Sequence, residues 1–313
     1  AILLSLVGSE MCIRDRDETN PMSDVFSFVN EKESLTLRYD LSAPLARFCA
    51  ENFRDLVFPY KRFSYGNVFR QEKADSARFR SFAQLDADII GDVNPSQADA
   101  EICNVISESF KKIGLTDEQF TINVSNKKIL QGLINDLKIE EDKQYKVLKS
   151  IDKLDRLGIK GVEELLKKGR QDQSGAFTKG CDLSDNQVSE IINFLNLKEI
   201  KDLKFNLKNN LSIEGINELE ELFEVLSFGN NQDSISIDVT KIRGLSYYTG
   251  FLVETNLNFK VTNAKGKEIN IGSVASGGRY DNLIARFKGA DYKGSGMSIG
   301  CLLYTSPSPR DSV

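Results

Sequence analysis

The segment from Tyr60 to Asp92 constrains the fold of this chain most, because it predicts a β-hairpin with one densely polar face. Residues 62–70 and 78–90 are predicted as two strands around a charged loop. In the second strand polar and apolar residues alternate, so they point to opposite faces of a sheet. The polar face carries Arg78, Arg80, Gln84, Asp86 and Asp88, interrupted by Phe82, and the apolar face carries Phe79, Ala83, Leu85, Ala87 and Ile89.

Two interpretations of this polar face are open from the residues alone. It is either the solvated side of an antiparallel sheet, which commonly alternates in this way, or a binding surface. Gln84 and Asp88 lie about 13 Å apart along one line of the strand, a separation that suits a small polar ligand lying across it. Arg70 and Arg78 could then bind phosphates, because guanidinium groups match phosphate oxygens with paired hydrogen bonds.

The composition removes several rival chemistries. Histidine is absent from all 313 residues, which excludes Ser-His-Asp and Cys-His nucleophilic sites and any zinc site that needs an imidazole. The five cysteines are scattered without a CxxC pair, which favours reduced thiols over disulfides or a metal site. We therefore expect no protein-held metal. The cysteines are Cys12, Cys49, Cys103, Cys181 and Cys301.

The charge balance and the apolar runs predict a cytoplasmic protein without a membrane anchor. A net charge of -5 gives no global basic surface, so any nucleic-acid contact must be local. The apolar run 1–7 is too short to span a bilayer, and no basic segment precedes it as a secretory signal would require.

Strands, then helices, then strands again follow one another along the chain. The patterns predict strands at 25–29, 34–37 and 120–126, and helices at 42–53 and 95–113. From residue 127 to 226 the pattern is helical, with Gly, Asp, Ser and Asn between the helices. Strands return at 234–240, 244–256 and 269–276. A sheet completed by distant segments, with a helical insertion, is therefore expected.

The two ends differ from the rest. Residues 5–16 and 302–313 show no helical or strand period, and the second stretch holds two of the six prolines. Both look like translated sequencing-adapter sequence. We therefore expect residues 1–16 and 302–313 to be non-native ends.

Three further segments each allow a structural and a functional interpretation. In SLTLRYDLSAPLAR, Asp40 or Ser42 either caps the following helix or binds a ligand. In IRGLSYYTG, Tyr247 and Tyr248 either alternate across a strand or line a pocket near Arg243. In ASGGRYDNLI, the pair Gly277 and Gly278 either makes a turn or lets a ligand approach the backbone, and no P-loop follows.

These segments together resemble histidyl-tRNA synthetases. VFRQE, an arginine eight residues later and FAQLDADIIG resemble motif 2 of that family, and IRGLSYYTG resembles its histidine-specific signature. The other two segments resemble parts of its amino-acid pocket, and GSGMSIG resembles the beginning of motif 3. The resemblance implies an α+β fold, namely a class II synthetase-like antiparallel sheet flanked by helices, with catalytic-core parts at 17–126 and 227–301 around a helical insertion at 127–226.

The resemblance also implies roles for individual residues. Arg70 would hold the α-phosphate of ATP with Arg243 as a second catalytic cation, Glu72 would lie at the adenine end, and Arg78 would reach the γ-phosphate. The remaining residues, together with Arg243, would bind histidine. Gln84 would meet the α-amino group of histidine and Asp88 the imidazole of histidine, with Gly277 and Gly278 as pocket backbone. The others are Asp40, Leu41, Ser42, Tyr247 and Tyr248.

A histidine-tRNA ligase activity follows from the resemblance, with ATP as substrate and Mg²⁺ held mainly by its phosphates. Its partners would be histidine and tRNA(His), and the intact parent would be a homodimer. One alternative is a non-catalytic, synthetase-like regulatory subunit of ATP phosphoribosyltransferase, and another is a synthetase-like sensor domain within a kinase.

The chain also departs from the family. The arginine expected three residues after Gly300 is Leu303, and neither the motif 1 helix nor an anticodon-binding domain is recognisable. We therefore expect a truncated catalytic core with little activity of its own.

Overall fold

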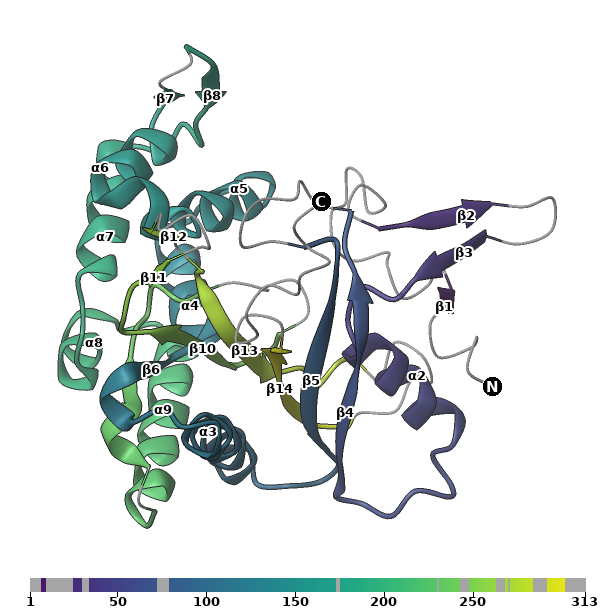
Figure 1. Cartoon of the computed structure of the whole chain (residues 1–313). Helices are drawn as coiled ribbons and strands as arrows, with labels where there is room; N and C mark the ends of the chain where they lie inside the picture. Colours follow the sequence, from purple (N-terminus) through teal and green to yellow (C-terminus); the bar gives the residue numbers. More distant parts are fainter. Residues whose placement is uncertain are drawn as a thin grey trace. The chain divides into compact units, whose positions relative to one another are not determined.

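The structure is a computed structural model that divides into two compact units (Figure 1). One unit comprises residues 1–122, 246–249 and 253–313, and the other comprises 123–245 and 250–252. The two units are described separately below. The residues that the structure describes are 7–9, 25–29, 34–71, 79–172, 175–229, 231–242, 248–262, 268–269, 271–283 and 292–301.

A seven-stranded sheet is the framework of the fold, and its strand order is β4-β5-β14-β13-β10-β6-β9. Strand β5 is antiparallel to both neighbours, and β14 is antiparallel to β13. Segments from the beginning and the end of the chain therefore alternate in the sheet, and this confirms the predicted α+β class. The strands are β4 (Tyr60–Phe69), β5 (Ser81–Ile90), β14 (Gly294–Gly300), β13 (Ser273–Arg279), β10 (Phe251–Leu257), β6 (Phe120–Asn126) and β9 (Ile235–Ile237).

The predicted hairpin is present as β4 and β5. Its register runs from the pair Tyr60 and Ile90 to the pair Phe69 and Ser81. The backbone N–H of Arg70 donates to the carbonyl of Arg80 at 2.8 Å and closes the last pair before the loop. Its strands begin and end within three residues of the predicted bounds, a shift typical of strand ends.

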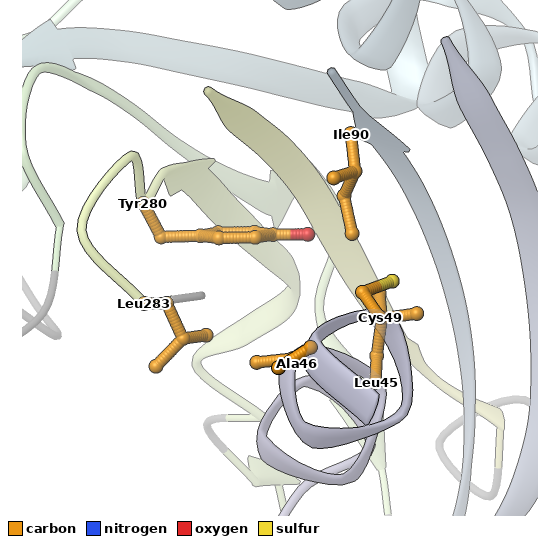
Figure 2. Packing of buried hydrophobic residues seen from close by; sticks show 7 residues of the cluster. Leu45, Ala46, Cys49, Ile90, Tyr280 and Leu283 are labelled. Carbon is orange, nitrogen blue, oxygen red and sulfur yellow. The ribbon is translucent and has the colours of Figure 1, made fainter. Parts of the chain in front are cut away.

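Helix α2 (Ser42–Glu51) packs one face into the core of the first unit. Its residues Leu45, Ala46 and Cys49 meet Ile90 of β5 and Tyr280, which follows β13 (Figure 2). Tyr280 is only 2% exposed, so its ring is part of this apolar core. The helix is two residues shorter than predicted. Ala50 and Leu283 complete the buried cluster.

Helix α3 (Pro95–Lys112) follows the predicted span closely and has clear end signals. The Asn94 side chain accepts a hydrogen bond from the Gln97 backbone N–H at 3.1 Å, and Pro95 occupies the first turn. Asp99, buried in this helix, forms an ion pair with Arg279 of β13. This pair ties the helix to the sheet.

The second unit contains the helices predicted between residues 127 and 226. Helices α4 and α9 pack together, and the Ser212 hydroxyl donates to the Ile129 carbonyl at 2.9 Å. A small hairpin, β7 (Gly169–Gln171) with β8 (Phe177–Lys179), was not predicted. The domain boundaries themselves stay a prediction. The helices are α4 (Lys127–Asp136), α5 (Glu141–Ile151), α6 (Leu154–Leu166), α7 (Asp185–Leu195), α8 (Ile200–Asn206) and α9 (Asn210–Ser227).

Several short strands depart from the predicted patterns. Strand β1 (Val7–Ser9) pairs with β3 (Ser34–Leu37), although no strand period was recognised there, because pairing with β3 compensates for its short length. On the other side, β3 pairs with β2 (Ser27–Val29). The strand predicted at 234–240 corresponds to β9, and the strand predicted at 244–256 corresponds to β10. The strand predicted at 269–276 overlaps both β12 (Glu268–Ile269) and β13. Strand β11 (Val261–Thr262) pairs with β12.

Among the described residues, no helix combines the length and apolar character needed to cross a membrane.

Candidate active site

The polar face of β5 is buried, so the interpretation as a solvated face is wrong. Gln84, Asp86 and Asp88 are 7%, 0% and 2% exposed. On the opposite face of the neighbouring strand β4, Phe63 and Tyr65 are 81% and 69% exposed. At this edge the sheet therefore covers its polar side chains and leaves large apolar ones accessible. Burying three polar side chains costs free energy unless partners or ligands satisfy them.

Cross-strand neighbours give each of these three positions a different environment. Gln84 lies between Gly66 of β4 and Gly300 of β14, so neither of its paired residues has a side chain. Asp86 lies between Ser64 and Ser298. The line of polar groups therefore has glycine partners at one end and hydroxyl neighbours in the middle.

Asp88 is the most firmly held group of the site. Its Oδ2 accepts hydrogen bonds from Nε and an Nη of Arg62, both at 3.2 Å, and its Oδ1 accepts the Tyr280 hydroxyl at 2.5 Å. Burial raises the pKa of this carboxyl, while Arg62 and the Tyr280 hydroxyl oppose the rise. Two fixed donors therefore orient the carboxylate, as a recognition group requires.

Neither Arg62 nor Tyr280 was predicted as a site residue. Arg62 lies opposite Asp88 in the hairpin register, so counting pairs outward from the loop would have identified it. Tyr280 follows the two glycines of ASGGRYDNLI, but its contact with Asp88 depends on β14 lying between β13 and β5. Local patterns carry no signal for that arrangement.

The segment before α2 contains a capping contact, and the N-cap residue is Leu41 rather than Asp40 or Ser42. Asp40 Oδ1 accepts the Ala43 backbone N–H at 3.0 Å, which is a capping contact, although Leu41 is the N-cap residue. Leu41 is buried, and its carbonyl accepts an Nη of Arg62 at 2.9 Å. Asp40 also raises the pKa of Asp86 and Asp88 through its charge. Ser42 begins the helix. The structure thus brings Asp40 and the polar face of β5 together.

Arg70 is held at the end of β4 by two aromatic rings. The centre of its guanidinium lies 4.5 Å from the Tyr39 ring centroid and 5.0 Å from that of Phe82. Its Nε also donates to the Tyr39 carbonyl at 3.5 Å, a long hydrogen bond. Stacked between rings, a guanidinium keeps a fixed orientation.

A second arginine, Arg38, covers the space beside Gln84. Its Nε donates to the Asn67 carbonyl at 2.6 Å, and a side chain added at Gly66 would place Cβ 2.4 Å from an Nη of Arg38. A side chain at position 66 would therefore displace the end of the Arg38 side chain. Burial lowers the pKa of Arg38, and the charge of Asp86 opposes that change. Sequence patterns gave no sign of this residue.

The glycine pair lies in strand β13 rather than in a turn. A Cβ on Gly277 would lie 2.2 Å from the Gly296 carbonyl oxygen of the paired strand, so strand packing alone accounts for this glycine. Gly278 pairs directly with Gly296. The predicted turn therefore starts only after Arg279, which corrects the sequence-based assignment. Tyr248 is half-buried against the core around α2.

Four predicted site residues lie outside the described residues: Glu72, Arg78, Arg243 and Tyr247. Within the described part of the chain, no group of three or more Cys, Asp or Glu side chains is placed to hold a metal ion. A hollow of about 390 Å³ contains none of the predicted site residues; it is lined by Leu257, Phe259, Lys260, Val261, Glu268, Ile271 and Gly272. Fixed side chains on β4, β5 and the segment before α2 thus identify the candidate site.

Comparison with known proteins identifies the family. A family model described as histidyl-tRNA synthetase matches residues 9–301. The histidine–tRNA ligase of Pelagibacter ubique is 59% identical over 286 residues, which are 91% of this chain and 62% of that protein. The histidine–tRNA ligase of Bartonella bacilliformis is 43% identical over 296 residues, which cover 91% of this chain and 60% of that protein. The chain thus spans about three fifths of the length of these curated relatives.

Solved structures agree with this assignment. The crystal structure of histidyl-tRNA synthetase from Nostoc sp. PCC 7120 matches with a TM-score of 0.75 at 26% identity, over 95% of this chain and 64% of that one. A structure described as an ATP phosphoribosyltransferase regulatory subunit/histidyl-tRNA synthetase from Bacillus halodurans matches with a TM-score of 0.71 at 23% identity, over 90% and 67%. The latter likeness concerns the fold alone. Since the family model covers nearly the whole chain and the resemblance seen in the motifs is confirmed, the chain belongs to the histidyl-tRNA synthetase family.

Proposed function

We propose that this chain is the histidine-activating part of a histidine–tRNA ligase. It would join histidine to ATP as histidyl-adenylate and release pyrophosphate, and the parent would then transfer histidine to tRNA(His). The observation that carries the proposal is the buried Asp88 carboxylate, held by Arg62 and Tyr280 in a chain 59% identical to a protein with that name. A fixed buried acceptor suits recognition of an imidazole N–H.

The chemistry explains why arginines belong beside this pocket. When the histidine carboxylate attacks the α-phosphorus of ATP, two anions approach each other, so fixed cations must offset their repulsion. We assign this role to Arg70 and Arg243, with Arg78 at the γ-phosphate and Glu72 at the adenine end. Arg70 is already oriented by the rings of Tyr39 and Phe82.

Histidine itself would lie along the polar face of the sheet. Its α-amino group would meet Gln84 together with Asp40 and Ser42, and its ring would meet Asp88. Tyr247, Tyr248 and the backbone of Leu41, Gly277 and Gly278 would complete the pocket. Gln84 has glycines as both of its cross-strand partners, and the substrate backbone would lie there beside Arg38, which covers Gly66.

Further properties of the intact parent are proposed on the strength of family membership. Mg²⁺ would enter with ATP, bound mainly by phosphate oxygens, which are the hard ligands that this ion prefers. The parent would act as a homodimer in the cytoplasm, with tRNA(His) as its macromolecular substrate. These proposals rest on the relatives rather than on the described residues.

Formation of histidyl-adenylate tests the proposed function. For this test, both ends of the chain are extended with the corresponding segments of the Pelagibacter ubique ligase. The product is called the completed chain. The completed chain is mixed, in excess over radiolabelled histidine, with ATP and Mg²⁺, and the reaction is quenched and analysed by chromatography. We expect the bound histidine to be converted to the adenylate in a single turnover. Histidine that binds without forming adenylate would contradict the proposal and favour a non-catalytic regulatory subunit.

A further inference from the structure

Three acceptor oxygens on the buried face of β5 have no hydrogen-bond donor within the described residues. They are Oε1 of Gln84 and both carboxylate oxygens of Asp86. The two side chains are two residues apart, so they point the same way from the strand. Two buried acceptor groups side by side, both without donors, require an explanation, because a buried polar group without a hydrogen-bond partner destabilises the fold.

Asp86 is completely buried, and its strand neighbours do not satisfy it. Ser298 of β14 is close enough for its hydroxyl to lower the pKa of Asp86, but it does not reach hydrogen-bond geometry with either oxygen. Ser64 occupies the corresponding position on β4. Burial is the main cause that raises the pKa of Asp86, to about 7.

The charges that face Asp86 come from every element around it. Asp88 on its own strand and Asp40 before α2 raise its pKa, and Arg62 on β4 lowers it. Arg38, after β3, and the thiol of Cys301, after β14, also interact with it electrostatically. Arg62 is engaged by Asp88, so its hydrogen bonds are not directed to Asp86.

Buried acceptor atoms without donors, one pair of them on a carboxylate, are complementary to a cation that donates several hydrogen bonds. An ammonium group has three N–H donors and no acceptor. The α-ammonium of an amino acid is therefore the part of the proposed substrate that matches this place. The imidazole is the weaker candidate, because the fixed Asp88 carboxylate already provides an oriented acceptor for it.

We propose that Asp86 is a further substrate-binding residue, which receives the α-ammonium group of the amino acid together with Gln84. This inference rests on the proposed function and deepens it, because it adds Asp86, a residue to which the family motifs gave no role, to the groups that would meet the ammonium group. In the absence of substrate the carboxyl holds a proton part of the time, and the arriving ammonium group stabilises its ionised form.

A proton linkage follows from this assignment. The bound ammonium lowers the pKa of Asp86, so binding at pH 6, below the ligand-free value of about 7, releases a proton. At pH 8 the carboxyl is already ionised and contributes no release. Histidine binding should therefore strengthen between pH 6 and pH 8 by more in the unchanged chain than in Asp86→Asn. The imidazole of the substrate titrates near 6.5 in both cases, so their difference isolates Asp86.

The experiment is calorimetric titration of the 313-residue chain with histidine and with histamine, which keeps the ammonium group but lacks the carboxylate. We expect Asp86→Asn to weaken both ligands about 10-fold at pH 8, because one charge-assisted hydrogen bond is lost. At pH 6, titration in two buffers of different ionisation enthalpy should show proton release that Asp86→Asn reduces. Asp92→Asn, an exposed carboxylate just after the same strand, is the matched control.

Thermal unfolding separates a binding role from a merely structural one. Asp86→Asn removes a buried ionisable group, so its Tm at pH 8 should equal or exceed that of the unchanged chain while its affinity falls. If Asp86→Asn binds both ligands with the affinity and the proton release of the unchanged chain, the inference is overturned while the proposed function stands. A lower Tm that accounts for the affinity loss would also overturn it. If the unchanged chain does not bind histidine, the proposed function fails for this chain, and the inference fails with it.

Discussion

Replacing Asp99 with alanine is expected to lower the free energy of unfolding by about 3–5 kcal/mol, a large part of the stability of a domain. Asp99 of α3 and Arg279 of β13 are 3% and 4% exposed and form a buried ion pair. Without Asp99 the guanidinium of Arg279 remains buried next to an apolar methyl group, with its main counter-charge lost. Urea denaturation followed by circular dichroism measures the change.

The chain offers a matched control on the same helix. Glu101 forms an ion pair with Lys61 of β4, but their side chains are 44% and 53% exposed. Water and salt screen such a pair, so Glu101→Ala should cost less than about 1 kcal/mol. Similar losses for the two variants would contradict the buried role of Asp99. Replacing both Asp99 and Arg279 with leucine and methionine should restore much of the lost stability.

Replacing Asp88 with asparagine is expected to reduce kcat/KM for histidine by about 100-fold in the completed chain, mainly through KM. Asparagine keeps the size of the side chain but removes the charge that Arg62 and the Tyr280 hydroxyl orient. The neutral amide then presents a weaker acceptor to the substrate ring. The KM for ATP should stay unchanged, because the phosphate-binding residues are untouched. Steady-state pyrophosphate exchange measures both constants.

Tyr280→Phe distinguishes orientation of Asp88 from its charge. The phenyl ring still fills the core beside α2 (Figure 2), and only the hydroxyl that holds Oδ1 is lost. We expect a smaller effect on the histidine KM than that of Asp88→Asn, with little change in Tm. A histidine KM that is the same in Asp88→Asn as in the unchanged chain would remove Asp88 from the pocket.

Local sequence patterns predicted the elements of this fold well. The strands at 34–37 and 120–126 have the predicted bounds, because alternation and turn residues delimit them clearly. Helices α2 and α3 end within two residues of the prediction. Short strands such as β1 and β9 were missed or overextended, because pairing with neighbours rather than their own pattern determines their length.

The site shows where such patterns stop being informative. Alternation placed Gln84 and Asp88 on one face, and the structure agrees, but alternation cannot tell whether that face is buried. The contact between Tyr280 and Asp88 depends on the insertion of β14 between β5 and β13, a pairing between segments about 200 residues apart in sequence. Arg38 and Arg62 approach the site through hairpin register and tertiary packing.

Family resemblance supplied what local physics could not, namely roles for Arg70 and Gln84. The same source provided no role for Asp86, which becomes noticeable only through its burial and its unsatisfied oxygens. The roles of Glu72, Arg78, Arg243 and Tyr247 stay predictions, because these residues lie outside the described part of the chain.

Amino-acid-dependent exchange of radiolabelled pyrophosphate into ATP, screened over all twenty amino acids, is the most direct test of histidine activation. The completed chain and the 313-residue chain are assayed side by side. Exchange that requires histidine and no other amino acid is the predicted result for the completed chain. Exchange with a different amino acid, or none with histidine although histidine binds, would contradict histidine activation by this polar face.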